Sequence, residues 1–243
     1  MAGSPCPVEI MKQVQSKMFM KEVSIGYGMT ETSPISTQTL IGTPLDKQVS
    51  TVGTVQDHIE IKIVDPETGQ TVGRNQPGEF CTRGYSVMMG YWNNEEATAE
   101  VIDEEGWMHS GDLASMDELG YVNIVGRITD MICRGGDNIY PREIEEFLYS
   151  HEAIADVQVI GVPSEKYIEE VMACIKLKPG FTISANDLRT FCKRQIANYK
   201  IPSYWKFVDS FPMTVTGKVR KKAMREEAIE ELGLREIASI KTS

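Results

Sequence analysis

Hydrophobic and polar positions recur with different periods along the chain, and the changes of period divide it into segments. Between residues 8 and 18 apolar side chains return every three to four positions, which predicts an amphipathic helix. The apolar run 23–27 follows and predicts a buried strand. A helix followed at once by a buried strand is half of a parallel-sheet unit, which cannot bury its own sheet face. We therefore expect the chain to begin inside a larger domain, with a partial parallel sheet.

The pattern shortens to a period of two in the section from about 49 to 92. Isoleucine alternates with a charged residue over 59–63, which is typical of a half-buried strand. Residues 65–69 predict a turn, and further strands are expected at 70–73 and 79–83. Short strands at this spacing predict a small β-barrel or antiparallel sheet.

Between this section and Gly126 the pattern predicts a short helix and a second hairpin. Asn93 or Asn94 can cap a helix that runs through Val101. Residues 117–120 form a turn signal between two apolar runs, 113–116 and 121–125.

After Gly126 helical and strand periods alternate, which predicts an independent α+β domain. A helix should begin at Pro141, and Ser184 with Asp187 has the spacing of a capping box. The remaining expected elements are strands at 131–133, 157–162, 171–177 and 205–208 and a helix over 220–232 that stops at Gly233. The fold class is therefore α/β, with the domains at 1–126 and 127–243 and a boundary within 126–130.

Composition and charge narrow the class of protein. Hydrophobic residues make up 41% and charged residues 25%, which excludes disorder and indicates a packed core. The net charge of -10 argues against nucleic acid as a partner. The segment 193–225 departs from that average, because it holds nine lysines and arginines against one acid. Such a segment suits a small polyanionic ligand or is an ordinary solvated basic face.

Cysteine use and the apolar runs predict a cytoplasmic protein. The five cysteines are widely spaced and form no C-x-x-C pair, which argues against a disulfide framework or zinc site. No uncharged apolar run approaches the ~18 residues of a membrane span. The sequence shows neither a secretory signal nor an arginine-rich transit peptide.

Two short segments carry candidate binding chemistry, although each has an ordinary turn as its alternative. In 26–31, a tyrosine between two glycines can present its ring to a planar base, a threonine can reach a phosphate, and a glutamate can bind magnesium. In 108–112, Asp112 can accept two ribose hydroxyls. His109 is interpreted as structural or pocket-lining, because no carboxylate stands at a readable spacing from it.

Two further segments lie in the second predicted domain. Arg127 stands at the domain junction, and the pair Gly135 and Gly136 allows close approach of a ligand to the backbone. Before the last helix, Gly217 precedes Lys218, which can reach an anionic centre as a flexible point charge. The alternative for this segment is an exposed basic loop.

The order and spacing of the four segments together resemble the adenylate-forming superfamily, which includes acyl-CoA synthetases, peptide-synthetase adenylation domains and beetle luciferases. The resemblance covers essentially the whole chain, with its most specific part at 126–145. Within the family the chain is similar to bacterial medium- or long-chain fatty-acid:CoA ligases and to mitochondrial acyl-CoA synthetase family member 2. Further matching segments are Gly78-Glu79-Phe80, Gly90-Tyr91-Trp92 and Asn198-Tyr199-Lys200-Ile201-Pro202.

The resemblance implies a role for five candidate residues between Tyr27 and Arg127. Tyr27 would stack on adenine, with Thr30 at the α-phosphate and Glu31 on Mg²⁺. Asp112 would clamp the ribose, and Arg127 would support ribose and phosphate. Residues 1–126 would thus be the C-terminal part of the large AMP-binding domain, and 127–243 its mobile lid domain.

The remaining roles are implied in the same way. Lys218 would stabilise the transition state of adenylation, and Gly135 and Gly136 would line the channel for the pantetheine arm of CoA. Gly3 and Ser4 match a segment that lies against adenine in relatives. ATP, Mg²⁺ and CoA would serve a ligase that joins CoA to a small carboxylic acid, such as a medium- or long-chain fatty acid.

Two departures from the family pattern bear on activity. The family's phosphate loop, T-S-G-T-T-G followed by lysine, does not occur in this sequence, so we expect the 243-residue chain alone to bind nucleotide weakly and to turn over little or nothing. Thr129 stands where relatives commonly have Asp or Lys at the hinge. A smaller departure is Ser110, where the family usually has Thr. Two alternatives stay open: a non-catalytic remnant that acts as a binding module, and an adenylation domain that loads a carrier protein.

Overall fold

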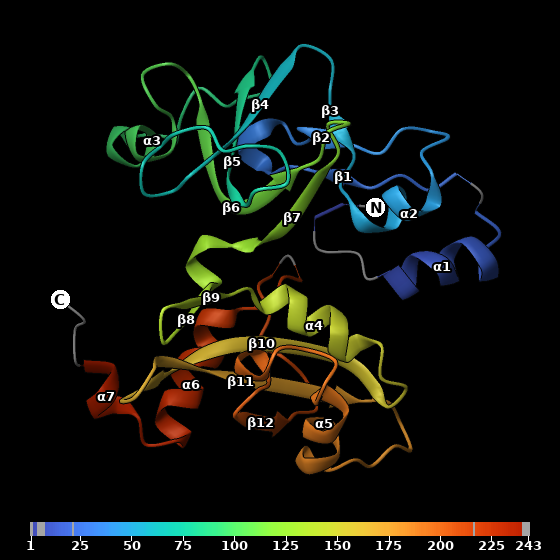
Figure 1. Ribbon diagram of the computed structural model, residues 1–243. Coiled ribbons are helices and arrows are strands. Elements are labelled where there is room, and N and C mark those ends of the chain that lie inside the picture. The colour runs from blue at the N-terminus through green and yellow to red at the C-terminus, as the bar shows by residue number, and fades with distance from the viewer. Residues whose placement is uncertain (1, 4–7, 21, 216, 240–243) are drawn as a thin grey trace. The chain divides into compact units, whose positions relative to one another are not determined.

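A computed structural model describes residues 2–3, 8–20, 22–215 and 217–239 of the chain. The chain divides into two compact units, Met1–Ile128 and Thr129–Ser243, which are described one at a time (Figure 1). The division lies inside the interval 126–130 that the sequence pattern indicates. It stands between Ile128 and Thr129 in a single 3-10 turn, Ile128–Asp130.

The first unit opens with short elements around a small core. The apolar side chains of Met11, Val23 and Ile25 are buried together. The elements are α1 (Val8–Lys17), β1 (Gly26–Tyr27), a 3-10 turn (Thr30–Thr32), β2 (Thr37–Gln38), α2 (Leu45–Ser50) and β3 (Thr54–Val55).

The prediction of a partial parallel sheet in this region is wrong for the described residues. Strand β1 pairs with β2, and β2 with β3, both antiparallel. Only nine residues separate β1 from β2. A parallel return needs a crossover of a dozen or more residues, so a chain that turns back this soon pairs antiparallel.

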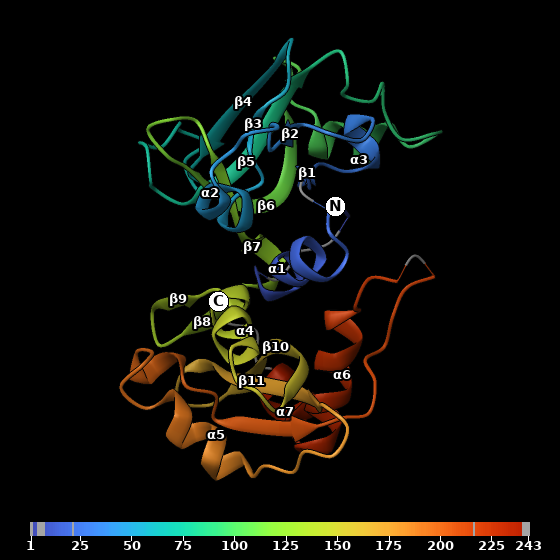
Figure 2. The same ribbon diagram turned by 90° about the vertical axis from the view of Figure 1, so that its right-hand side faces the viewer.

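The rest of the first unit is a four-stranded antiparallel sheet in the order β4-β5-β6-β7 (Figure 2). Alternating apolar residues bury one face of it, with Ile63, Phe80, Ala114 and Val122 in the core. Its elements are β4 (Ile59–Val64), β5 (Gly78–Gly84), α3 (Glu95–Val101), β6 (Met108–Met116) and β7 (Val122–Arg127).

The predicted β-barrel is wrong, because this sheet is open. Closure would require β4 to pair with β7, whereas among the described residues these two are the sheet's edges. The strand expected at 70–73 is reduced to a single bridge between Thr71 and Val64. The helix capped by Asn94 and the hairpin that turns at 117–120 are present.

The second unit packs helices on both faces of a five-stranded sheet. Residues of one parity on β10 and β11 face α4 and α5, and include Val157 and Ile175. Those of the other parity, including Ile160 and Cys174, face α6. This two-sided burial explains the apolar stretches 159–163 of β10 and 171–175 of β11. Strand β12 runs parallel to β11, and the other pairings are antiparallel.

The elements of the second unit begin close to where the sequence pattern places them. Helix α5 opens with the Ser184–Asp187 capping box. The helix expected over 220–232 is α6, and Leu232 caps it; β9 and α7 were not expected. The bounds are β8 (Ile132–Arg134), β9 (Asp137–Ile139), α4 (Pro141–Tyr149), β10 (Ile154–Ser164), β11 (Ile168–Leu177), α5 (Ala185–Cys192), a 3-10 turn (Asn198–Lys200), β12 (Tyr204–Phe207), α6 (Lys221–Glu231) and α7 (Arg235–Ser239).

Among the residues that the structure describes, none of the helices has both the length and the apolar character needed to cross a membrane.

Candidate functional site

The segment around Tyr27 is fixed by close backbone packing. A Cβ built on Gly28 would lie 2.0 Å from the carbonyl oxygen of Pro34, so only glycine fits there. The amide of Ser36 donates to the carbonyl of Tyr27 at 2.8 Å. The Tyr27 ring packs edge-on against Phe80 with centroids 5.1 Å apart. These contacts hold the tyrosine against the sheet.

Strand β6 bulges at the segment that carries Asp112. Cys81 pairs with His109 and Glu79 pairs with Leu113, so three residues of β6 stand opposite Phe80 alone. The displaced backbone is satisfied by side chains. The hydroxyl of Ser110 donates to the carbonyl of Phe80 at 2.7 Å, and the amide of Gly111 donates to Glu79 Oε1 at 2.9 Å. Bulges of this kind re-aim side chains, and here the side chain is that of Asp112.

A second bulge, on β7, selects the residue that faces Asp112. In the β6–β7 hairpin Met116 pairs with Val122, and a regular ladder would place Gly126 opposite Asp112. The register shifts by one residue between Leu113 and Ala114, so Arg127 takes that place. Directly opposite residues point to the same face of a sheet, so Arg127 can reach the carboxylate.

The three residues meet at the Asp112 carboxylate, which is buried. The Tyr27 hydroxyl donates to Asp112 Oδ2 at 2.7 Å, and Arg127 Nε lies 3.0 Å from Asp112 Oδ1. Burial, followed by the charge of Asp112, raises the pKa of Tyr27 well above its ordinary value, so the phenol stays protonated and donates. The Arg127 side chain is 56% exposed, so this group is open to solvent on the arginine side.

The predicted phosphate and magnesium residues lie one turn further along the chain. Thr30 is exposed at the start of the 3-10 turn Thr30–Thr32. The hydroxyl of Tyr91 donates to Glu31 Oε1 at 3.0 Å, and the amide of Met88 donates to the Glu31 carbonyl at 2.8 Å. Residues near 90 therefore fix the orientation of the Glu31 carboxylate.

The glycine pair of the second unit forms a two-residue hairpin turn between β8 and β9. Gly135 has φ +61° and Gly136 has φ +94°, a combination that suits a type I′ turn. The amide of Gly135 donates to the carbonyl of Tyr167 at 2.9 Å. Arg134 stacks over the Tyr167 ring and pairs with Glu170 through two hydrogen bonds of 2.7 and 3.0 Å. The turn is thus exposed, and the contacts of Gly135 and Arg134 with Tyr167 and Glu170 hold its base.

Lys218 occupies an exposed turn just before α6. Its amide donates to the Thr214 hydroxyl at 3.0 Å, and the amide of Thr214 donates to the Lys218 carbonyl at 2.8 Å. Gly217 has φ +80°, which favours glycine in this turn. Hydrogen bonds thus join Thr214 to Lys218, and the Lys218 side chain is exposed to solvent.

Three other residues were singled out from the sequence: Thr129, Gly3 and Ser4. Thr129 is exposed and is the first residue of the second unit. Gly3 is exposed, and a Cβ there would meet no atom within 4 Å. Ser4 lies outside the described residues.

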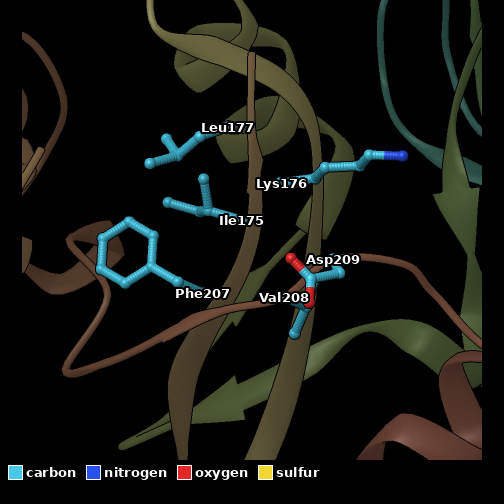
Figure 3. Close-up of a pocket in the computed structure, with 6 residues that line it drawn as sticks. All are labelled: Ile175, Lys176, Leu177, Phe207, Val208 and Asp209. Atoms are coloured by element: carbon cyan, nitrogen blue, oxygen red, sulfur yellow. The ribbon is translucent and has the colours of Figure 1, made fainter. Parts of the chain in front are cut away.

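Two hollows in the described part of the chain are lined by residues other than the Asp112 group. One of about 230 Å³ lies in the second unit where β11 and β12 run parallel, lined by Ile175, Lys176, Leu177, Phe207, Val208 and Asp209 (Figure 3). The other, of about 670 Å³, lies in the first unit beside Glu22, Thr39 and Gln48.

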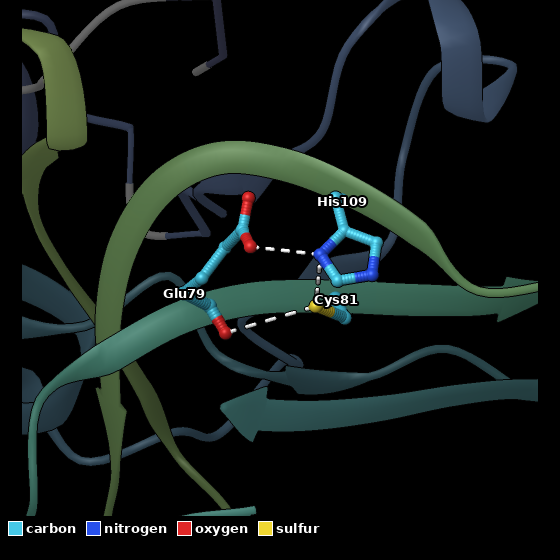
Figure 4. A group of neighbouring side chains, drawn as sticks. All are labelled: Glu79, Cys81 and His109. Carbon is cyan, nitrogen blue, oxygen red and sulfur yellow. Dashed lines mark hydrogen bonds and ion pairs between the residues drawn. The ribbon is translucent and has the colours of Figure 1, made fainter. Parts of the chain in front are cut away.

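Sequence reasoning missed one group of side chains. His109 Nδ1 lies 2.8 Å from Glu79 Oε2 and 3.5 Å from Cys81 Sγ (Figure 4). No carboxylate stands at a readable spacing from His109 in the sequence, but strand pairing supplies one from 30 residues upstream. The alternation Glu-x-Cys on a strand was the available signal. The sequence also gave no indication that Tyr91, which lies in the matching segment Gly90-Tyr91-Trp92, contacts Glu31.

Comparisons with known proteins agree in both units. The model of the AMP-binding enzyme family matches residues 1–92, and that of the AMP-binding enzyme C-terminal domain matches residues 143–218. The acyl-CoA synthetase YngI of Bacillus subtilis is 53% identical over 96% of this chain and 43% of its own length. The mitochondrial medium-chain acyl-CoA ligase ACSF2 is 47% identical in Danio rerio and 41% identical in Homo sapiens, over 96% of this chain and 38% of each ligase.

Solved structures show the same likeness. ATP-bound MatB from Rhodopseudomonas palustris superposes with a TM-score of 0.88 at 31% identity, over 95% of this chain and 45% of MatB. The o-succinylbenzoate CoA synthetase MenE of Bacillus subtilis, in complex with its acyl-adenylate, gives a TM-score of 0.82 at 31% identity, over 92% of this chain and 45% of MenE. The chain therefore spans less than half the length of the relatives named here.

Proposed function

Because the chain belongs to the AMP-binding, adenylate-forming enzymes, we propose that it is the C-terminal part of an ATP-dependent acid:CoA ligase. In the first half-reaction a carboxylate oxygen attacks the α-phosphate of ATP, and pyrophosphate leaves. In the second half-reaction the CoA thiol displaces AMP from the acyl-adenylate. The substrate class we propose is a medium- or long-chain fatty acid, since the relatives include medium-chain acyl-CoA ligases.

The observation that carries the proposal is the convergence of Tyr27 and Arg127 on the Asp112 carboxylate. Each carboxylate oxygen has two acceptor sites, so Asp112 can accept ribose hydroxyls while it keeps its protein donors. Both donors favour the ionised form of the carboxylate, which makes stronger hydrogen bonds than a neutral acid. The exposed guanidinium of Arg127 adds positive charge beside the place where a phosphate chain would begin.

Glu31 fits a magnesium ion of the kind that nucleotide-dependent enzymes use. Mg²⁺ keeps several waters and takes one or two carboxylates together with substrate phosphates. Tyr91 donates to Oε1 of Glu31, which orients the carboxylate and leaves Oε2 available to a metal. When bound, the ion would reduce the repulsion between the acid and the phosphates. Thr30, exposed beside it, would donate to the α-phosphate.

Lys218 would add a second cation, against the charge that develops as pyrophosphate leaves. We propose that the second unit rotates about Thr129, so that Lys218 is exchanged for the Gly135–Gly136 turn before CoA attacks. Two features support this proposal: the units divide at Thr129, and both turns belong to the second unit. The glycine turn presents backbone without side chains, which suits a narrow passage for the pantetheine arm.

We further propose that the 243-residue chain alone turns over little or no substrate. Its sequence contains no T-S-G-T-T-G segment to hold the β- and γ-phosphates. Acid-dependent release of pyrophosphate by the isolated chain would contradict this.

The ligase proposal is tested with the full-length protein that contains this chain. AMP formation is measured across carboxylic acids of increasing chain length, with and without CoA. We expect AMP that depends on the acid, and an acyl-CoA product. Acyl transfer only to a carrier protein would favour a carrier-loading domain, and nucleotide binding without AMP would favour a binding module.

The site assignment is tested in the same assay with Asp112→Asn. This variant keeps an acceptor for Tyr27 but loses the charge, and we expect at least a ~10-fold loss of kcat/KM for ATP. Asp57→Asn is the matched control, because Asp57 is an exposed acid of the same unit. Equal activity in the two variants would remove Asp112 from the site while leaving the ligase activity itself established.

A further inference from the structure

The first unit contains three metal-binding side chains gathered by strand geometry. Glu79 and Cys81 are two residues apart on β5, so their side chains share a face of the sheet. His109 on β6 is the direct partner of Cys81 in the ladder. The histidine ring is turned toward both (Figure 4). One sulfur, one nitrogen and one oxygen thus converge.

The distances suit a small tetrahedral ion. One ligand atom from each residue lies within 4.8 Å of the others, with His109 Nδ1 at 3.5 Å from Cys81 Sγ and 2.8 Å from Glu79 Oε2. Tetrahedral Zn²⁺ with bonds of about 2.0–2.3 Å holds its ligands roughly 3.5 Å apart. A sub-ångström shift of Glu79 therefore opens the site to that size.

A fourth group, the carboxylate of Asp103, lies near the other ring nitrogen of His109. A metal-binding histidine donates its other ring N–H to a carboxylate, which fixes the tautomer. Here Asp103 Oδ2 lies 3.7 Å from His109 Nε2. Because Nδ1 lies 2.8 Å from Glu79 Oε2, binding of a metal to Nδ1 would move the ring proton to Nε2, on the side of Asp103.

Burial and charge allow a divalent cation to enter and stay. Cys81 is fully buried, whereas the side chain of His109 is 31% exposed, so an ion can reach the sulfur past the imidazole. Lys62 faces Cys81 from β4, and its ammonium lies over the Trp107 ring at 4.4 Å. Two carboxylates against this one ammonium leave the site negative before a cation binds.

We propose that Cys81, His109 and Glu79 form a binding site for Zn²⁺, with water as the fourth ligand. The mixed sulfur, nitrogen and oxygen donors select zinc over magnesium or calcium, which prefer oxygen alone. Binding forms a Zn–S bond and releases the thiol proton to solvent, one per ion. Because Glu79 Oε1 holds the amide of Gly111, the ion would also stiffen the turn that carries Asp112. The site stands independently of the proposed ligase activity.

The experiment uses Co²⁺ as a spectroscopic substitute for Zn²⁺, on the 243-residue chain without a polyhistidine tag. We expect one Co²⁺ per chain, with a thiolate-to-cobalt charge-transfer band that Zn²⁺ abolishes. Cys81→Ser should abolish the band and weaken binding at least ~100-fold. Cys174→Ser should change neither, since Cys174 is an equally buried cysteine in the other unit. A band that persists in Cys81→Ser, or no binding by the unaltered chain, would overturn the proposal.

Two further variants keep the test decisive if Cys81→Ser fails to fold. His109→Gln removes a partly exposed ligand and should also abolish the band, whereas His151→Gln should retain it. Asp103→Asn leaves all three ligands in place and should weaken Co²⁺ binding ~10–100-fold. Unchanged affinity in His109→Gln would refute the site. Circular dichroism without metal shows that each variant has folded.

Discussion

The two units hold their candidate residues in opposite ways. In the first unit Tyr27, Asp112 and Arg127 are tied to one another, and Phe80 packs against the tyrosine ring. In the second unit Lys218 and the Gly135–Gly136 turn are exposed, and the contacts described for them are made by their backbone amides and carbonyls and by neighbouring residues. The first arrangement orients groups before a ligand arrives. The second arrangement leaves the Lys218 side chain exposed, so that it can act at a site to which movement of its loop brings it.

This difference separates function from stability in a testable way. A residue packed into the sheet contributes to ligand binding and to stability, so its substitution should lower activity and the free energy of unfolding. A residue on an exposed turn can be removed with little effect on folding. Under the proposed function, the first unit would bind the nucleotide and the second would present a cation and a passage in turn.

The largest expected effect is on catalysis, from Lys218→Ala in the full-length protein. Losing one cation at the developing charge should slow adenylation ~100-fold or more, or about 3 kcal/mol in the barrier. The free energy of unfolding should change by less than about 0.5 kcal/mol. The measurement is acid-dependent release of pyrophosphate, alongside urea unfolding. Lys222→Ala is the control, because Lys222 is an exposed lysine on α6. An equal loss of activity in this variant would show that the rate depends on the net charge of the unit and not on Lys218 itself.

Gly28→Ala should show the reverse behaviour, since its cost lies in folding. The added Cβ would lie 2.0 Å from the Pro34 carbonyl oxygen, which the backbone must move to relieve. We expect a loss of about 3 kcal/mol in the unfolding of the first unit, measured in urea. Gly73→Ala is the matched control, because its Cβ would make only an ordinary contact at 3.5 Å. Equal stability of the two variants would show that the turn around Tyr27 is looser than described.

Local sequence signals identified most helices and strands, because contacts between residues close in sequence determine where these elements begin and end. The Ser184 capping box and the hairpin turn at 117–120 depend on residues a few positions apart. The errors concern pairing over distance. Whether β4 meets β7, and whether β2 returns antiparallel to β1, depends on connections that alternation does not encode.

The candidate site shows the same limit more sharply. The resemblance singled out Tyr27, Asp112 and Arg127, yet their mutual contacts arise from two bulges that shift register by one or two residues. Strand periodicity alone would have placed Gly126 opposite Asp112. The histidine partner Glu79 was likewise hidden, because 30 residues separate it from His109.

The pH dependence of the stability of the second unit should show how much the Arg134–Glu170 ion pair beside the Gly135–Gly136 turn contributes. The pKa of Glu170 lies below its ordinary value; burial opposes this, and hydrogen bonds from Arg134 and Ser203 outweigh it. Between the folded and unfolded pKa values the unfolded chain binds more protons. The contribution of the ionised Glu170 to the free energy of unfolding is therefore complete above the unfolded pKa of about 4.3. It is lost as the pH falls through the folded pKa.

Glu170→Gln should lower the unfolding free energy of the second unit by about 2 kcal/mol at pH 7. The gap between variant and unaltered chain should narrow as pH falls toward 3, because protonation removes the same charge. Urea unfolding at a series of pH values measures this. Glu226→Gln, at an exposed glutamate, should show no such convergence. A gap that stays constant with pH would mean that the Arg134 pair contributes nothing to stability.

The smallest effects compare two helix caps, one in each unit. The Asn94 side chain accepts from the amide of Ala97 at the start of α3, which buries none of its residues. Ser184 caps α5, which buries Leu188 and Cys192. Removing either cap by alanine costs its own helix about 1 kcal/mol. Because α3 can open without exposing core, Asn94→Ala should speed hydrogen exchange in α3 alone.

Ser184→Ala, in contrast, should lower the global stability of the second unit by about 1 kcal/mol, since α5 cannot open without uncovering Leu188. Hydrogen exchange followed by mass spectrometry distinguishes the two outcomes peptide by peptide. If Asn94→Ala lowered global stability as much as Ser184→Ala, α3 would have to be coupled to the sheet of the first unit. The helix would then belong to the tightly packed part of that unit, although it contributes no buried side chain to its core.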